Sequence, residues 1–390
     1  MSCMYPGWAV LGMAALAMVG TLPGRTQGLG LVTEPLLRDF GLDRVAYANI
    51  NLWATLIGAA FNLPCGRLVD RYGARVVMTG LLLALGLTVL LMAGSGSLVV
   101  LAVTITLTRG FGQSALSVVS LALAGKWFAR RINLAMGVYA LLVGMGFIAA
   151  FPSVGQAILK FGWRAAWSGV GWALVAVLAP LAWWIVREAP ATEEVPGPVG
   201  GMAFRRAVRT PAFWVFGLSS AMFGLVYSGI ALFNQSILER KGFDATTYQT
   251  VLVVSTLLGL LANFGGGWAA MRWPLQRLMG VGMGVLAGSL VALPLVRTFG
   301  EVMGYGVAMG VAGGVVTVVF FSVWSQVFGR AELGRIQGAA QMMTVMASAV
   351  GPVLLAEALA RTGSYDLMFW ILAGLTASLG VACWKVRLPI

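Results

Sequence analysis

Two arginines lie inside long apolar runs of this sequence, where a charged side chain is unfavourable unless it has a partner. Arg25 interrupts the first run within 23–28, and Arg109 is about 11 residues into the run that covers 98–125. An arginine in hydrocarbon costs at least about 2.5–3.5 kcal/mol, so each must find a partner or water. The thirteen Asp and Glu residues are all expected in loops or at helix ends. This uncompensated positive charge predicts a site for an anion, which a guanidinium binds through two parallel hydrogen bonds.

Other polar residues in the apolar runs are weaker candidates for substrate contact. Arg25 itself has an alternative, because a long side chain near a helix end can reach the outer interface. Polar groups at helical spacing also join neighbouring helices in membranes without touching a substrate. With that alternative open, the further candidates for the site are Gln113, Tyr47, Asn51, Tyr227, Asn263 and Gln341.

The composition is that of an integral membrane protein. Of 390 residues, 59% are hydrophobic and 10% are charged, against about 25% charged in a typical soluble domain. The net charge of +13 comes from basic residues scattered between apolar runs, so we exclude a nucleic-acid groove. Three cysteines without histidine predict no disulfide framework, and we expect no metal, no cofactor and no enzyme activity. The N-terminus has no basic segment or cleavage motif, so we expect no removable signal peptide.

The second half of the chain repeats the first at an offset of about 200 residues. The repeat rests on Tyr47, Asn62, Gly66 and Arg71, each matched 201 positions later, and on Phe128 and Pro152, each matched 200 positions later. Chance similarity among apolar helices does not explain polar matches in order. The repeat predicts an all-α membrane protein with twelve transmembrane helices in two pseudo-symmetric six-helix bundles. The expected domains are 1–188 and 211–390, joined by a hydrophilic linker at 189–210.

The basic residues predict the orientation in the membrane. Sixteen of the 26 Lys and Arg fall on the side that holds both chain ends and the linker; nine fall on the other side, and Arg109 lies within a span. Positive loops are retained in the cytoplasm. We therefore expect a multi-pass protein of the cell inner membrane with both termini cytoplasmic.

A charged stretch joins the second and third expected spans. It reads Gly66-Arg67-Leu68-Val69-Asp70-Arg71-Tyr72-Gly73-Ala74-Arg75, and we expect a short turn there. It resembles the signature G-x-L-x-D-R-x-G-R-R of the major facilitator superfamily, with Ala74 in place of the first terminal arginine. The resemblance implies two bundles that rock about a central site, with a gating role for Gly66, Asp70, Arg71, Gly73 and Arg75. The alternative is an ordinary basic loop that anchors topology by charge alone.

Shorter segments resemble parts of the same superfamily. The stretch 109–113 is similar to its fourth-helix motif, which implies a structural or coupling role for Arg109 as the alternative to substrate contact. The stretches 209–214 and 126–131 look like bacterial relatives of the monocarboxylate and oxalate carriers. In that group an arginine of the eighth helix commonly contacts the carboxylate. Here the eighth span has no charge before Arg272, at its cytoplasmic end.

These features together predict a secondary transporter of small organic anions, with monocarboxylates as the favoured class. The expected partners are a small anionic substrate, protons or a counter-anion, and the lipid bilayer; we expect a monomer that binds no nucleic acid. An exporter of drug-like or cationic compounds and a transport-inactive receptor or scaffold are the alternatives. The chain has no histidine, and we expect Glu34 and Glu357 toward the outer ends of their helices. We therefore expect the substrate, rather than a protein carboxylate, to supply any proton.

Overall fold

The computed structural model describes residues 6–127, 132–187, 202–329 and 333–388. The chain divides into two compact units, Met1–Glu194 and Val195–Ile390. The predicted linker at 189–210 falls partly outside the described residues, and its described part, from Met202, belongs to the second unit. The proposed bounds 1–188 and 211–390 stay a prediction.

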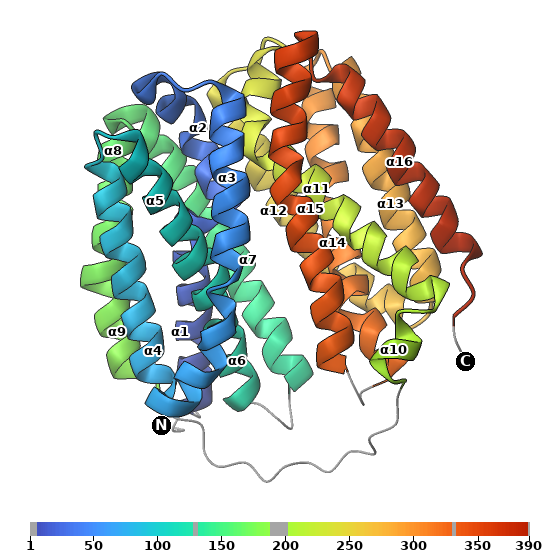
Figure 1. Cartoon of the computed structure of the whole chain (residues 1–390), viewed down its shortest axis with the longest axis horizontal. Helices are drawn as coiled ribbons and strands as arrows, with labels where there is room; N and C mark the ends of the chain where they lie inside the picture. Colours follow the sequence, from blue (N-terminus) through green and yellow to red (C-terminus); the bar gives the residue numbers. More distant parts are fainter. Residues whose placement is uncertain (1–5, 128–131, 188–201, 330–332, 389–390) are drawn as a thin grey trace. The chain divides into compact units, whose positions relative to one another are not determined.

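The first unit is a bundle of helices (Figure 1). Its α-helices are α1 (Pro6–Gly20), α2 (Thr26–Phe40), α3 (Arg44–Ala59), α4 (Asn62–Ala93), α5 (Leu98–Thr108), α6 (Ser117–Trp127), α7 (Ile132–Phe161), α8 (Trp163–Trp172) and α9 (Ala179–Ile185). The 3-10 helix η1 (Leu22–Gly24) separates α1 from α2. The π-helices η2 (Arg109–Leu116) and η4 (Ala173–Leu178) connect α5 to α6 and α8 to α9. The first, fourth and sixth predicted spans are therefore each interrupted α-helices.

The second unit consists of longer helices. They are α10 (Phe204–Ala207), α11 (Pro211–Glu239), α12 (Ala245–Ala270), α13 (Leu275–Ala292), η5 (Leu293–Leu295), α14 (Phe299–Phe328), α15 (Leu333–Thr362) and α16 (Asp366–Lys385). Helix α12 packs against α14, α11 against α15, and α13 against α16 (Figure 1). An aromatic core closes one end, where the ring of Trp324 stacks on Phe328 with centroids 6.0 Å apart. Met202 donates its backbone N–H to the Phe328 carbonyl at 2.8 Å, which fixes the segment before α10 to this core.

Among the described residues, eleven helices are long and apolar enough to cross a membrane. The second predicted span is the one not among them, because α3 has only 16 residues before the turn at 60–61. Helix α4 begins at Asn62, so its first turns continue that span. This agrees with an all-α membrane protein of twelve membrane helices.

One local expectation was wrong. The predicted turn at 66–75 is mostly helical, since only Gly73 leaves the helical region, with φ 82° and ψ 154°. Glycine adopts a positive φ without the steric cost that other residues have. The charged and polar residues therefore suggested a turn where a helix in fact extends beyond the apolar run.

The two units repeat their turns as well as their helices. Gly41 and Gly242, 201 positions apart, both follow a helix end with positive φ, and so do Gly162 and Gly363. Asp43 caps α3 by accepting from the Ala46 N–H at 2.7 Å, and Asp244, also 201 positions later, caps α12 by accepting from the Thr247 N–H at 2.8 Å. A glycine that ends one helix and a carboxylate that caps the next are needed at the same places in both units. The repeat in the amino-acid sequence is therefore also a repeat in the structure.

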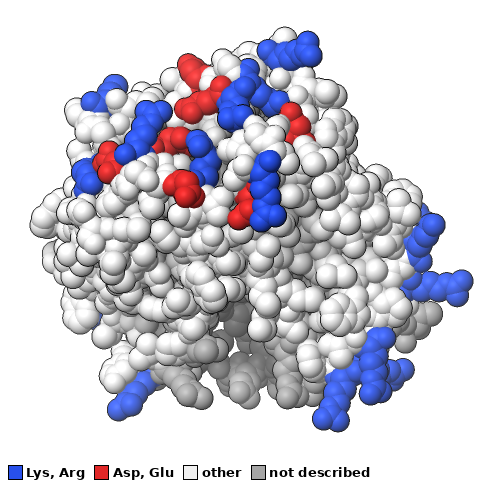
Figure 2. Space-filling view, turned by 45° about the horizontal axis from the view of Figure 1, so that its top comes forward, with Lys and Arg blue, Asp and Glu red and all other residues white. Residues whose placement is uncertain are grey.

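Acidic side chains gather at one set of helix ends, and exposed arginines lie at the opposite ends. In the second unit, acidic residues lie where α11 and α15 end and where α12, α14 and α16 begin: Glu239, Glu357, Asp244, Glu301 and Asp366. The opposite helix ends carry exposed arginines, among them Arg209, Arg272 and Arg277. Figure 2 shows acidic and basic side chains mixed on one face and, among the described residues, Lys and Arg toward the lower edge of the view. Such an asymmetry is typical of a membrane protein with one positive side.

Candidate functional site

The first membrane helix breaks at the segment that contains Arg25. Pro23 lacks a backbone donor, and Gly24 lies so close to the junction of α5 and η2 that an added Cβ would be 2.2 Å from the Thr108 carbonyl oxygen. After η1 the backbone of Arg25 is extended, with φ −86° and ψ 151°, and α2 starts at the next residue. Discontinuous membrane helices of this kind form substrate sites in many transporters, because backbone groups are freed at the break.

Arg25 lies half-buried at this break. Its Nε donates to the Thr21 Oγ1 at 2.7 Å, and its Nη2 contacts the Met18 Sδ at 2.8 Å. The guanidinium carbon lies 5.1 Å from the centroid of the Phe147 ring. Phe147 in turn stacks on Phe151, with centroids 5.2 Å apart and planes 14° from parallel. An aromatic face attracts the cation through its ring quadrupole and does not neutralise its charge.

Arg109 is the first residue of η2, and only 2% of its surface is exposed. Its Nη1 donates to the Thr26 Oγ1 at 2.8 Å and to the Gln113 Oε1 at 2.6 Å, and its Nη2 donates to the Asn51 Oδ1 at 2.9 Å. All three acceptors are neutral, and its Nε is buried without a partner. Arg109 thereby ties α2, α3 and η2 together while its positive charge stays uncompensated within the described contacts.

The close packing of α3 on η2 makes this arrangement possible. A Cβ added to Gly58 would be 2.9 Å from the Arg109 Cβ, so only glycine lets the two backbones approach this far. The Phe61 and Phe111 rings meet edge to face at 5.3 Å below it. Small residues at crossing points are the usual means of close helix contact in membranes.

The structure brings four of the sequence candidates of this unit together. Arg109 contacts Asn51 and Gln113 directly, and Asn51 donates its Nδ2 to the Tyr47 backbone oxygen at 3.0 Å. The Tyr47 hydroxyl is buried and has no hydrogen-bond partner among the described residues. Arg25 is linked to this group through its neighbour Thr26, which sequence reasoning missed. Thr26 lies in the interrupted segment 23–28, so its position was the signal that could have identified it.

The candidates of the second unit do not gather in the same way. Tyr227 is half-buried and stacks on Phe223 with centroids 5.3 Å apart. Asn263 is half-buried on α12, and Gln341 is exposed on α15. Near Tyr227 lie Tyr248 and Tyr305, both buried, which sequence reasoning did not select. This part of the second unit is aromatic and uncharged.

The expected gating residues lie along the first half of α4 and at its break. Gly73 is the break itself, and Arg75 just after it donates its Nε to the Val186 carbonyl at 2.7 Å. Arg71 is exposed and lies 5.3 Å from the ring centroid of Tyr72. The side chain of Asp70 is outside what the structure describes, and Gly66 is helical. Arg75 thus holds the end of α9 against α4, while the gating role of all five residues stays a prediction.

Comparison with known proteins identifies the family. The sequence profile of the Major Facilitator Superfamily matches residues 8–238 and 216–390, which together cover nearly the whole chain. The chain belongs to the Major Facilitator Superfamily. It is therefore a transporter of that superfamily, and the resemblance of 66–75 to the superfamily signature is confirmed.

Relatives within the superfamily have differing substrates in their names. The chain is 28% identical over 390 residues to "Monocarboxylate transporter 11" of Mus musculus, covering 94% of this chain and 84% of that protein. It is 25% identical over 387 residues to "Probable nitrate/nitrite antiporter NarK1" of Thermus thermophilus, covering 89% and 84%. A solved structure of a bacterial homologue of the human lysosomal transporter Spinster is similar, with a TM-score of 0.74, 16% identity, and 98% and 94% of the two chains covered. That last likeness concerns the fold.

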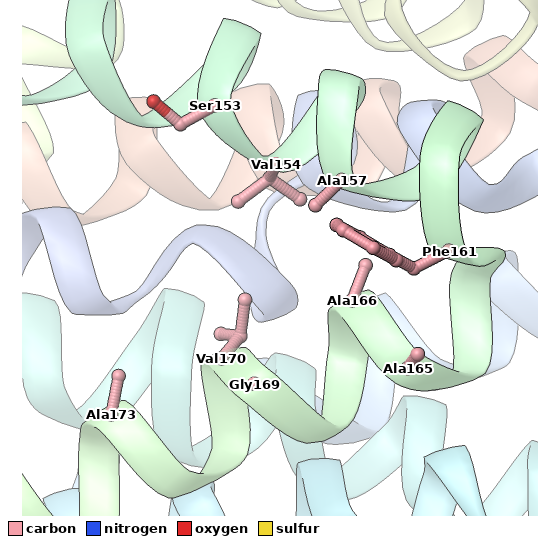
Figure 3. A pocket seen from close by; sticks show the side chains of 9 residues that line it. All are labelled: Ser153, Val154, Ala157, Phe161, Ala165, Ala166, Gly169, Val170 and Ala173. Carbon is pink, nitrogen blue, oxygen red and sulfur yellow. The ribbon is translucent and has the colours of Figure 1, made fainter.

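A hollow in this superfamily member lies away from the two arginines. It measures about 420 Å³ and lies between α7 and α8, lined by Ser153, Val154, Ala157, Phe161, Ala165, Ala166, Gly169, Val170 and Ala173. Figure 3 shows the Val154 and Ala157 side chains directed from α7 toward Ala166 and Val170 of α8. The lining offers no charged group, so this hollow does not fit an anion.

Proposed function

We propose that this Major Facilitator Superfamily transporter carries small organic anions, with monocarboxylates as the favoured class. The observation that carries the proposal is Arg109, a buried arginine in a membrane span whose hydrogen-bond acceptors are all neutral. Its contact with Thr26 places it beside the helix break that exposes Arg25. Two cations at one break repel each other and are costly to bury in the membrane. A bound anion would lower that cost, so the pair favours an anion there.

We assign different roles to Arg109 and Arg25. Arg109 donates hydrogen bonds from both terminal nitrogens and is nearly inaccessible, so we assign it to holding α2, α3 and η2 and to the local field. Arg25 is half-buried with an aromatic ring behind it, so we assign it to the substrate. Asn51, Gln113 and Thr26 position Arg109, and Tyr47 borders the same polar group. In the second unit we propose Tyr227, Asn263 and Gln341 as substrate contacts, and this proposal rests on the sequence alone.

Nitrate is the second candidate substrate, because NarK1 is among the relatives. A guanidinium matches the planar oxygens of nitrate as it matches those of a carboxylate. A cationic or drug-like substrate is disfavoured, since it would meet the positive charges of Arg25 and Arg109. The names of two monocarboxylate transporters among the relatives, of Mus musculus and Bos taurus, support the organic anion.

We further infer the membrane arrangement and cycle. The helix ends where the described charged residues are arginines face the cytoplasm, with both termini and the linker on that side of a cell inner membrane. The halves 1–188 and 211–390 alternate access to the site as rocking bodies, with the α4 break at Gly73 as part of the gate. Symport with a proton and exchange for a counter-anion are both compatible with a monomer of this kind.

The test is uptake into proteoliposomes made with the purified protein. We expect saturable uptake of labelled pyruvate or lactate, and nitrate in the same assay decides between the organic and inorganic class. Arg25→Ala should weaken anion binding by about 1.5–3 kcal/mol, the range for a charge-assisted hydrogen bond. Arg25→Lys should restore only part of it, because lysine lacks the planar fork.

Arg38→Ala is the matched control, since Arg38 is an exposed arginine on the same helix. It should leave anion binding unchanged. Undiminished affinity in the Arg25→Ala protein would remove Arg25 from the site, and absence of uptake of every anion would point to a receptor or scaffold.

A further inference from the structure

A small polar hollow lies at one end of the second unit, where α11 ends and α16 begins. It measures about 140 Å³. Sites for drug-sized ligands measure roughly 300–1,000 Å³, so this hollow has room only for a small molecule. Its lining combines the charged side chains of Arg240, Lys241 and Asp366 with the buried side chains of Ile237, Tyr365 and Phe369.

The charged groups of the hollow do not balance. The Lys241 Nζ lies 3.7 Å from the Asp366 Oδ1, beyond hydrogen-bond distance, and the Asp366 side chain is 47% exposed. Lys241 donates instead to the Pro294 carbonyl at 2.8 Å. Arg240 donates from its Nη2 to the Gly363 carbonyl and forms no ion pair with the described residues. Two cations against one carboxylate leave one positive charge, which a monoanion would compensate.

Other titratable groups near the hollow have partners of their own. Glu239 accepts from the Gln235 Nε2 at 2.8 Å, and Glu357 pairs with Arg361 at 2.8 Å. The Tyr365 hydroxyl shares a hydrogen bond with Ser236 at 3.3 Å. In the described part of this unit, the acid that lines the hollow is therefore Asp366.

The equivalent end of the first unit holds a balanced pair instead. Asp39 lies 201 positions before Arg240, and its Oδ2 accepts from the Arg164 Nε at 3.3 Å. Arg164 also donates to the Ala93 carbonyl at 2.9 Å, and the carbonyl 201 positions later, of Pro294, accepts from the lysine of the hollow. Both units therefore bind this carbonyl with a cation, but the acid of the first unit is replaced by an arginine in the second.

The hollow also has donors that an anion can use. The Arg240 Nε and Nη1 have no acceptor among the described residues. The Ser364 Oγ accepts from the Asp366 N–H at 3.1 Å, which leaves the hydroxyl proton of Ser364 to donate. A guanidinium matches the planar oxygens of a carboxylate or of nitrate, and the apolar side chains suit a methyl group beside them.

We propose that this hollow is a second anion-binding site, which takes a small monoanion such as a short-chain carboxylate or nitrate. The identity of the anion rests on the proposed function, whereas the site is distinct from Arg25 because it lies in the other unit. The hollow is at the end of the unit that we assign to the outside of the cell. A cation-rich hollow raises the local concentration of an anion, so the site collects the anion from the medium.

The experiment measures pyruvate binding to the purified protein in detergent by calorimetry, in a buffer without chloride. We expect two binding events in the wild type and one in the Arg25→Ala protein. Adding Arg240→Gln to Arg25→Ala should weaken the remaining event by about 10- to 100-fold, because a charge-assisted hydrogen bond is lost. Arg297→Gln in the same background is the matched control, since Arg297 is an exposed arginine at the same end of the unit that does not line the hollow.

Asp366→Asn tests the charge balance in the opposite direction. Without the one acid of the lining, pyruvate should bind about two- to fivefold more tightly in the Arg25→Ala background. A variant that merely folds less well would not gain affinity, so this result separates charge from stability. Nitrate should compete with pyruvate for the event that Arg240→Gln weakens.

The outcomes separate this site from the proposed function. Equal pyruvate binding in Arg25→Ala and Arg25→Ala/Arg240→Gln, or an unchanged affinity in Asp366→Asn, overturns the second site and leaves the first intact. Displacement of pyruvate from the hollow by added phosphatidylglycerol overturns it in favour of a lipid phosphate. Failure of the wild type to bind either anion overturns the proposed function and this site together.

Discussion

In the first unit the helix that begins at Pro6 breaks at Gly20 and resumes at Thr26, whereas the corresponding helix of the second unit runs from Pro211 to Glu239 as one piece. The fourth helix of the first unit is also interrupted, because a π-helix joins α5 to α6. The equivalent helix of the second unit, α14, is continuous. Both departures lie where Arg25 and Arg109 are found. The unit with the interrupted helices is the unit with charge inside it.

One of these interruptions is a π-helix. A π turn accommodates one residue more than an α turn. In the first unit η2 begins at Arg109, whose side chain donates to Thr26 and Asn51.

The second unit uses the equivalent positions for packing. Gly310 and Gly314, 201 positions after Arg109 and Gln113, lie against α12, and a Cβ on either would be 2.4 Å from a backbone oxygen. The same duplicated fold thus places a buried, hydrogen-bonded arginine at one helix crossing and bare backbone contact at the other.

The largest effect is expected where backbone meets backbone. Gly310→Val would place its side chain against the Ser255 oxygen, so we expect a loss of about 3 kcal/mol in the free energy of unfolding. Thermal unfolding of the purified protein in detergent measures it. Gly304→Val on the same helix, where a Cβ meets nothing within 4 Å, is the control and should be tolerated. Equal stability of the two variants would mean that α12 and α14 do not pack as described.

An intermediate effect is expected for Arg109. Arg109→Met keeps the volume but leaves the oxygens of Thr26, Asn51 and Gln113 without their donor, which should cost about 2 kcal/mol of stability. Arg25→Met should destabilise less, because Arg25 is half-buried and makes fewer such bonds. Unfolding temperatures with and without pyruvate separate the roles. A stable Arg109→Met protein that has lost pyruvate binding would make Arg109 the contact residue instead.

The smallest effect is expected at the caps that the two units share. Asp244→Ala and Asp43→Ala each remove a helix cap and should each cost about 1 kcal/mol. Hydrogen bonds from Thr246 and Thr247 hold the pKa of Asp244 at about 2, below the ordinary carboxyl value. Its contribution is therefore complete at neutral pH and is lost as the pH falls toward about 2. Acid unfolding curves of the wild type and Asp244→Ala should converge there; a constant difference would contradict the cap.

The apolar runs and the offset of 201 were enough to predict the helices and the duplication. Hydrophobic length and the need to bond every backbone group within the span leave few alternatives to a helix in lipid. The same reasoning selected Arg25 and Arg109, because an arginine within an apolar run is conspicuous at any depth. It misplaced the stretch 66–75, since a polar residue at the end of an apolar run does not reveal whether the helix stops there.

What the sequence determined by itself is local: which segments span the membrane, where glycines and aspartates turn the chain, and which span holds a cation. What the tertiary structure decided is pairing. Thr26, Asn51 and Gln113 meet Arg109, and Arg44 meets Glu34, because a helix break, a π turn and a close approach at Gly58 set the distances between different helices. Those distances depend on how side chains of several helices fill space together, and spacing along any one helix carries no information about them.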